Sequence, residues 1–196
     1  MIEETTVKRS ARMTRQRILE AAILRFSRHS YEATTLRDIA ADVGVDVALV
    51  HRSFGSKEEL FQQAARTAFN GDFRQAMQAP DLGAAMTALF VQSRLEPASG
   101  TDPLDIVTHS LSSDRASPIL RELVEQDFIR PLALRLDGAE VGAALAMACL
   151  AGVALLRDVL GIAALRDADI EEMRPLIAAL MCTCLGPRAR KETPCP

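Results

Sequence analysis

The sequence predicts an all-α fold. Only 4% of the 196 residues are aromatic, β-branched residues form only short runs, and apolar residues recur at intervals of three and four along the chain. Apolar residues make up 48% of the chain, which is enough to bury a core. We expect an N-terminal three-helix helix-turn-helix domain followed by a larger C-terminal helical domain.

The first helix is predicted over residues 14–28. One face of it is apolar at helical spacing, through Ile18, Leu19, Ala22, Ile23 and Phe26. Four basic residues lie before the helix or at its start, namely Lys8, Arg9, Arg12 and Arg15. They are interpreted either as a flexible arm that reaches the backbone or minor groove of DNA, or as a solvated tail.

Two short helices follow. Thr35, with Asp38 three residues later, is typical of a helix start, and Gly44 ends that helix after about two turns. Asp46 can cap the next helix, which is predicted to reach Ser53. Two short helices joined by a turn of three or four residues predict a helix-turn-helix.

A fourth helix is predicted to begin after Ser56, with Glu59 as the partner in its capping box, and to link the two domains. Further helices are expected at 82–95, 103–111, 118–136, 140–160 and 169–185. Pro131 should kink or split its helix, and Pro175 should do the same unless its helix starts there. Residues 97–102 are expected to form a loop, and residues 186–196 a disordered tail.

The composition gives no sign of export or of a membrane span. Residues 1–12 are largely polar and charged, so the chain is expected in the cytoplasm. The most apolar run, residues 141–156, contains two glycines and is shorter than the ~20 residues that a span requires. Reduced thiols are expected for the four cysteines, Cys149, Cys182, Cys184 and Cys195.

The charge is distributed unevenly along the chain. The formal net charge is −3, yet residues 1–57 carry 10 basic and 7 acidic side chains, so the excess of acidic residues lies in the remainder. A basic N-terminal part favours contact with nucleic acid. The alternative is an ordinary imbalance between solvated helix faces.

Residues 14–61, TRQRILEAAILRFSRHSYEATTLRDIAADVGVDVALVHRSFGSKEELF, resemble the DNA-binding domain of the TetR family of regulators. The resemblance rests on the Thr-Arg opening, the Asp-Ile-Ala helix followed by Gly44-Val45, and the closing Phe-Gly-Ser-Lys-Glu. It implies a DNA-binding domain at 12–72 and a ligand-binding and dimerisation domain at 73–185. The partners are then a palindromic double-stranded operator and a second copy of the chain.

The helix-turn-helix geometry places the third helix in the major groove. Ala48 and Leu49 can make apolar contacts to bases, and His51 can reach a base edge or a phosphate. Phosphate contacts are expected from Thr35, Arg52, Ser53 and Lys57. The alternatives are a surface role for His51 and an ion pair along its own helix for Lys57, although Leu60 and Phe61 carry no charge to receive one.

The resemblance also implies that the last two helices pair with their twins in a homodimer, and that a small ligand binds among the middle helices. The ligand is expected to be apolar, with no cofactor or metal, and the residues that can line its site are Phe69, Phe73, Met86, Phe90, His109, Phe128 and Met147. The alternative for each of these side chains is ordinary core packing.

Other functional classes are less well supported. No metal-ligand spacing, phosphate-binding glycine loop or nucleophile elbow occurs, so an enzyme is not predicted. A redox-responsive regulator remains an alternative, although Cys182 and Cys184 would face different directions on a helix. Either repression or activation of transcription is compatible with these residues, although a ligand-responsive repressor is favoured.

Overall fold

The computed structural model describes residues 2–95 and 103–186, including their side chains except those of residues 2–8, 70–72 and 92–95. The described residues form helices and connecting turns without a strand, which confirms the predicted all-α fold. The expected loop at 97–102 and nearly all of the expected tail lie outside the described residues. The chain divides into two compact units, each of which is described by itself.

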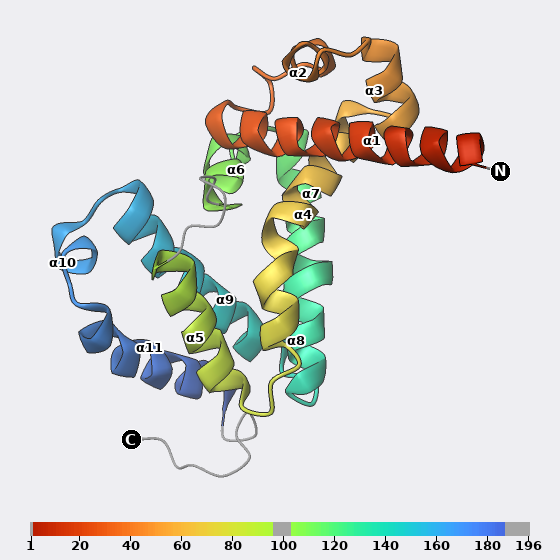
Figure 1. The fold of residues 1–196 in the computed structure, drawn as a ribbon. Coiled ribbons are helices and arrows are strands. Elements are labelled where there is room, and N and C mark those ends of the chain that lie inside the picture. Colours follow the sequence, from red (N-terminus) through yellow and green to blue (C-terminus); the bar gives the residue numbers. More distant parts are fainter. Residues whose placement is uncertain (1, 96–102, 187–196) are drawn as a thin grey trace. The chain divides into compact units, whose positions relative to one another are not determined.

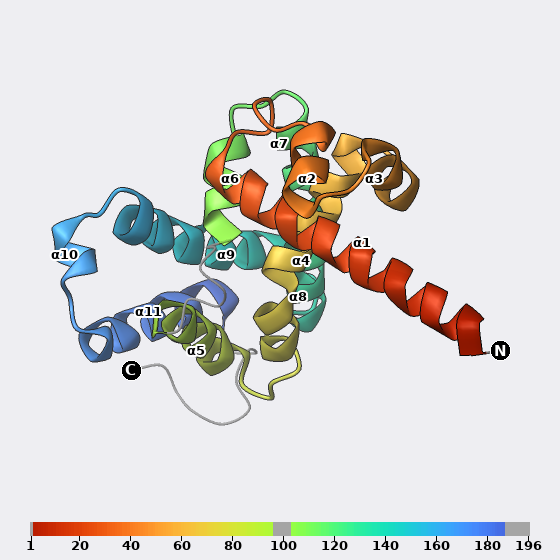
Figure 2. The ribbon, with the colours of Figure 1, turned by 45° about the horizontal axis from the view of Figure 1, so that its top comes forward.

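The first unit contains residues 2–68 and 103–121. Its helices are α1 (Ile2–Arg28), α2 (Leu36–Val43), α3 (Val47–Phe54), the start of α4 (Lys57–Ala76), α6 (Pro103–Ser110) and the start of α7 (Ala116–Val124). Helix α1 packs against α2, α3 and α6, and α2 packs against α3 (Figures 1 and 2). The two short helices therefore form the expected helix-turn-helix, supported by α1.

The first helix is longer than predicted, because α1 begins at Ile2 rather than near Thr14. No glycine or proline occurs before Gly44, so nothing in the sequence stops the helix from extending toward the N-terminus. Glu3 and Glu4 also lie in the first turn, where acidic side chains favour a helix. The basic residues before Thr14 are thus carried on a helix rather than on an irregular arm.

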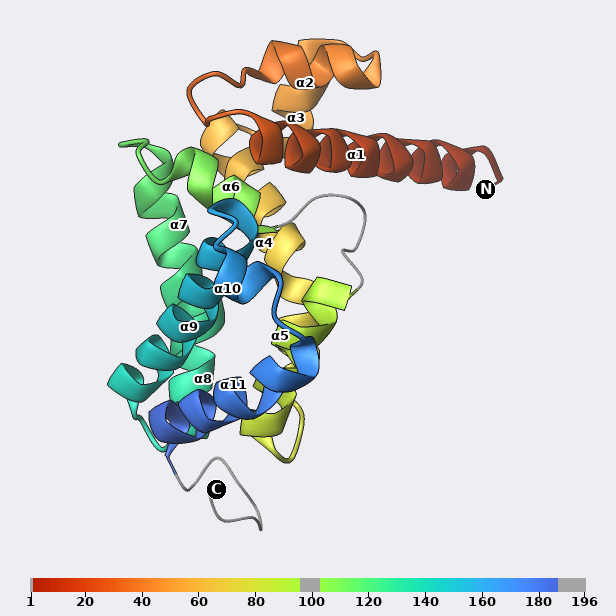
Figure 3. The same ribbon diagram turned by 90° about the vertical axis from the view of Figure 1, so that its left-hand side faces the viewer.

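The second unit contains residues 69–95 and 122–186. Its elements after α4 are α5 (Leu82–Leu95), η2 (Glu125–Ile129), α8 (Arg130–Arg135), α9 (Glu140–Ala154), η3 (Leu155–Val159), α10 (Ala163–Arg166) and α11 (Ile170–Leu185). Helix α11 packs against both α5 and α9, and α9 packs against α8 (Figure 3). The short helix α10 was not predicted.

Pro131 changes the geometry of its helix, as predicted. The segment immediately before it, η2, is wound as a π-helix, and Pro131 lies in the first turn of α8. Proline has no N–H to donate to the carbonyl four residues back, so regular α-helical bonding cannot continue through it. Pro175 instead lies inside α11, which begins at Ile170.

Helices α9 and α11 approach closely at Gly142. A Cβ atom at this position would lie 2.5 Å from the backbone oxygen of Cys184, nearer than real Cβ contacts allow. The helices can therefore pack at this spacing only without a side chain at residue 142. The segment Glu140–Val159 is also long and apolar enough to cross a membrane by length and composition alone, yet here it packs against α8 and α11.

We expect Gly142→Ala to lower the stability of the second unit, because the new methyl group would force α9 away from α11. Overpacking of this kind costs about 1–3 kcal/mol. The matched control is Gly83→Ala in α5, where the added Cβ meets only ordinary contacts. Thermal unfolding at one fixed protein concentration should give a lower midpoint for Gly142→Ala and an unchanged or higher one for Gly83→Ala; equal midpoints would contradict the close approach.

Candidate nucleic-acid interface

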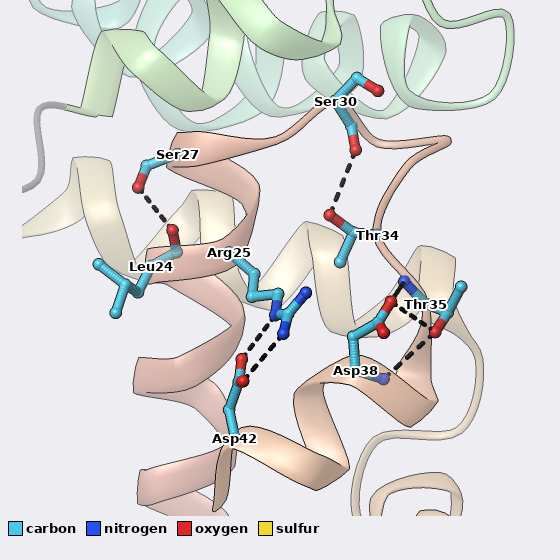
Figure 4. A network of polar contacts seen from close by, with 8 residues as sticks. All are labelled: Leu24, Arg25, Ser27, Ser30, Thr34, Thr35, Asp38 and Asp42. Atoms are coloured by element: carbon cyan, nitrogen blue, oxygen red, sulfur yellow. Dashed lines mark hydrogen bonds and ion pairs between the residues drawn. The ribbon is translucent and has the colours of Figure 1, made fainter.

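Helix α2 begins and ends with the caps that the sequence predicts. The backbone N–H of Asp38 donates to the Thr35 hydroxyl at 3.2 Å, and the Thr35 N–H donates to the Asp38 carboxylate at 2.9 Å, which completes a capping box (Figure 4). Gly44 closes the helix in the left-handed conformation, with φ +74°. These local bonds fix the length of α2 at eight residues.

An ion pair fixes α2 against α1. The Arg25 guanidinium donates two hydrogen bonds to Asp42, at 2.6 and 2.9 Å (Figure 4). These bonds lower the pKa of Asp42 below its ordinary value and raise the pKa of Arg25. Arg17 adds a bond of 2.9 Å to the backbone oxygen of Val43, the last residue of α2. Two arginines of α1 thus hold the C-terminal end of α2.

Helix α3 has one buried face and one face available for DNA. Its N-cap Asp46 accepts a bond from the Ala48 N–H at 2.6 Å, and Val50 and Phe54 are buried. The side chains predicted to read DNA lie away from this core: Ala48, His51 and Arg52 are exposed, and Leu49 and Ser53 are half-buried. Helix α3 therefore presents a short surface with apolar, imidazole and guanidinium groups side by side.

His51 is oriented by the end of its own helix. Its Nδ1 lies 3.0 Å from the backbone oxygen of Gly55, and because a carbonyl only accepts, Nδ1 carries the proton. The other ring nitrogen, Nε2, is left to accept from a base edge when the ring is neutral. This contact also spans the C-terminus of α3, where the Gly55 N–H donates to the His51 carbonyl.

Gly55 and Ser56 make the transition from α3 to α4. Gly55 has φ +80°, and a Cβ there would overlap the Glu59 carboxylate, so only glycine fits without movement. The Ser56 N–H donates to Glu59 at 2.7 Å and the Glu59 N–H donates to Ser56 Oγ at 3.1 Å, which is the predicted capping box. The first turn of α4 therefore begins directly after the exposed end of α3.

Lys57, the first residue of α4, makes a contact with Tyr31 that the sequence analysis did not predict. Its Nζ is 4.0 Å from the centre of the Tyr31 ring, an arrangement in which the ring face attracts a cation. The pKa of Lys57 is lowered, chiefly because burial removes water from the ammonium group, while the nearby Glu32 and Glu58 carboxylates act in the opposite direction. The only feature of the sequence that could have indicated this contact was the aromatic side chain of Tyr31.

The four basic residues that were predicted to lie before the first helix or at its start divide into two groups. Arg9 and Arg12 are exposed, and the side chain of Lys8 lies outside those that the structure describes. Arg15 instead lies over the Phe54 ring at 4.3 Å and donates to the Gln63 side chain. Arg15 therefore connects α1 to the last residue of α3 and to the second turn of α4.

The candidate ligand residues are found in both units. Phe69, Phe73 and Phe128 meet in the second unit, with ring centres 5.7 Å apart for Phe69–Phe128 and 4.6 Å apart for Phe73–Phe128. Met86 and Phe90 are buried in the same unit, and Met147 is half-buried. His109 is exposed on α6 in the first unit, where Nδ1 lies 2.8 Å from the Asp105 carbonyl.

The cysteines are not all reduced: Cys182 is disulfide-bonded, which corrects the expectation of reduced thiols. Cys149 and Cys184 are free thiols on the packed helices α9 and α11. Burial, together with the neighbouring Cys149 thiol, raises the pKa of Cys184. A raised pKa reduces the thiolate form that reacts with oxidants.

Two family matches cover most of the chain. Residues 18–64 match the family described as "Bacterial regulatory proteins, tetR family", and residues 80–185 match the family described as "Tetracyclin repressor-like, C-terminal domain". No curated protein matches the chain. The two matched regions correspond to the helix-turn-helix with its flanking helices and to most of the remaining helices.

Solved structures from Streptomyces coelicolor A3 have the same fold. One is a TetR-family regulator with 26% sequence identity and a TM-score of 0.58; the alignment covers 88% of this chain and 94% of that protein. The other is a TetR-family member with 23% identity and a TM-score of 0.59, and its alignment covers 85% and 97% of the two chains. Because the sequence identity to this second structure is only 23%, the similarity supports the fold alone.

We expect Thr35→Ala to raise the pKa of Asp38. Hydrogen bonds from the Thr35 hydroxyl and backbone lower this pKa in the folded chain, and only the hydroxyl bond is removed. Because the folded-state pKa is depressed, the stabilisation is present at neutral pH and is lost as the pH falls through that pKa. A carbon-13 NMR titration should show the change, with Asp42, which bonds Arg25, as internal control. An unaltered Asp38 titration would exclude the capping box.

Proposed function

The chain belongs to the TetR family of transcriptional regulators, and on this premise we propose that it is a ligand-responsive repressor that binds a palindromic operator as a homodimer. The single observation that carries the proposal is the exposed face of α3, with Ala48, His51 and Arg52 directed away from a core that contains Val50 and Phe54. A helix fixed on one face and exposed on the other can enter the major groove. The chain acts in the cytoplasm as a regulator and not as an enzyme.

Base reading and phosphate binding are divided between two groups of residues. Ala48 and Leu49 make apolar contacts, for example with a thymine methyl group, and His51 Nε2 accepts from an exocyclic amino group. Arg52, Ser53, Lys57 and the amides at the start of α2, beside Thr35, contact phosphates. The exposed Arg9 and Arg12 of α1 extend the phosphate contacts along the adjacent backbone.

The homodimer forms through α9 and α11. Val141 and Leu145 lie one turn apart on α9, and Leu176 and Leu180 lie one turn apart on α11. All four are exposed, with 74% of Val141 and 65% of Leu176 accessible in the single chain. Exposed large apolar side chains on two helices that pack together are typical of an interface. Pairing through these helices presents two copies of α3 to two operator half-sites.

The ligand is a small and largely apolar molecule that binds in the second unit. The aromatic cluster of Phe69, Phe73 and Phe128, with Met86, Phe90 and Met147, supplies apolar surface for it. The predicted contact from His109 is not included in this site, because His109 belongs to α6 of the first unit. Binding changes operator affinity only if the ligand prefers one of two conformations of the dimer. The proposal includes a DNA-binding domain at 12–72 and a ligand-binding and dimerisation domain at 73–185.

We expect salt-sensitive, nanomolar binding to a palindrome in the DNA upstream of the protein's own gene. Lys57→Ala should weaken operator binding at least tenfold, which is on the order of the free energy of one charged hydrogen bond. Because each of the two protomers loses one phosphate contact, the slope of log K against log salt should fall by about 2. The matched control is Arg166→Ala, which removes one exposed cation from α10. Equal binding to random DNA of the same length would contradict sequence-specific regulation.

We expect Leu176→Glu to convert the dimer into a monomer, because the interface would then bury two unpaired carboxylates. Leu111→Glu is the control, since Leu111 is 57% exposed in the first unit and lies outside the proposed interface. Analytical ultracentrifugation at micromolar concentration should give a monomer for Leu176→Glu and a dimer for the wild type and Leu111→Glu. A monomeric wild type would rule out the homodimer.

A further inference from the structure

Lys57 occupies an unusual position for a surface cation at a helix start. Its side chain is half-buried, and its Nζ lies 4.0 Å from the centre of the Tyr31 ring. A lysine side chain in water samples many rotamers, and fixing it in one of them is entropically unfavourable. The ring contact supplies part of that ordering before any DNA is bound.

Tyr31 is itself held rigidly. Its side chain is buried, and its ring lies against Phe26 and Phe61, at 6.1 and 5.1 Å between ring centres. Phe26 and Phe61 also contact each other edge to face, at 4.9 Å. The surface on which the ammonium group rests is therefore part of the core that joins α1, the α1–α2 link and α4.

The carboxylates near Lys57 are bound to other groups. Glu32 accepts a hydrogen bond of 2.5 Å from the Ser113 hydroxyl, and Glu58 lies 3.7 Å from the Arg115 guanidinium. Among the described residues, no carboxylate comes within ion-pair distance of Lys57 Nζ. The ammonium group is thus partly desolvated and is not paired with a carboxylate of the described residues.

We propose that Tyr31 is a positioning residue for DNA binding: its ring holds the Lys57 ammonium group at the start of α4, ready to receive an operator phosphate. The inference rests on the proposed function, in which Lys57 binds a phosphate. It adds that the strength of this contact depends on a buried aromatic ring 26 positions earlier in the sequence. Part of the ordering and dehydration that phosphate binding requires has then already taken place in the free protein.

The test is a double-mutant cycle on operator binding. Lys57→Gln is combined with Tyr31→Leu, and separately with Phe26→Leu, which removes an aromatic ring from the same cluster. Among the described residues, no cation lies over the Phe26 ring. We expect Tyr31→Leu to weaken binding and to reduce the salt slope in the Lys57 protein, and to have little further effect in the Lys57→Gln protein. Tyr31→Phe, which keeps the ring, should bind with the wild-type slope.

Failures of the two ideas can be distinguished. If Lys57→Gln leaves binding and its salt slope unchanged, the phosphate role of Lys57 in the proposed function is wrong. If Lys57→Gln weakens binding but Tyr31→Leu behaves like Phe26→Leu and adds independently to Lys57→Gln, Tyr31 is only a core residue and the inference is overturned.

A second measurement needs no variant to fold. Protons that lie over an aromatic ring resonate upfield, so the Lys57 ε-CH2 protons of the wild type should be displaced from the ordinary lysine position. An ordinary chemical shift would overturn the inference. An upfield displacement in the wild type would support it.

Discussion

The aromatic cluster of Phe26, Tyr31 and Phe61 is the interaction on which the first unit depends. It joins the end of α1, the link that follows and the first turns of α4, and all three side chains are buried. Helices α2 and α3 are each only eight residues long, too short to be stable in isolation. They hold their positions because α1 and α4 are fixed to each other and because Arg25 and Arg17 bind the end of α2.

This arrangement explains how the exposed face of α3, which we propose reads DNA, is held in place. Val50 and Phe54 anchor α3 on the core side, and the N-cap Asp46 and the Gly55 turn fix both of its ends. The residues on the opposite face do not pack against this core, so they can contact another molecule. The same core extends to Lys57 through the Tyr31 ring, so stability and the proposed phosphate contact share a common set of side chains.

The second unit is organised around small residues and an uncovered apolar surface. Gly142 lets α9 approach α11, and Ala143 and Ala146 are fully buried in the same helix. The larger side chains of Val141 and Leu145 on α9 are exposed, and on α11 Leu176 and Leu180 are exposed while Met173, Ile177, Met181 and Leu185 are buried. In α9 this distribution reverses that of an ordinary core helix, because the buried residues are the small Ala143, Ala146 and Ala154 while the larger Val141 and Leu145 are exposed. A helix with these properties is better suited to pairing with another chain than to burial within its own.

Local signals in the sequence determined the helical fold, the helix-turn-helix and its caps. Thr35 with Asp38, Gly44, and Ser56 with Glu59 act over three or four residues, so a linear pattern contains all the information they need. The start of α1, the π-helical segments and α10 were not predicted. A sequence that is compatible with a helix does not specify where the helix ends or how tightly it winds, because packing decides both. The tertiary structure alone decided that Lys57 meets Tyr31, that Arg15 meets Phe54 and that Leu176 remains exposed. Contacts between residues far apart in the chain depend on how helices pack, and periodicity within one helix does not encode that.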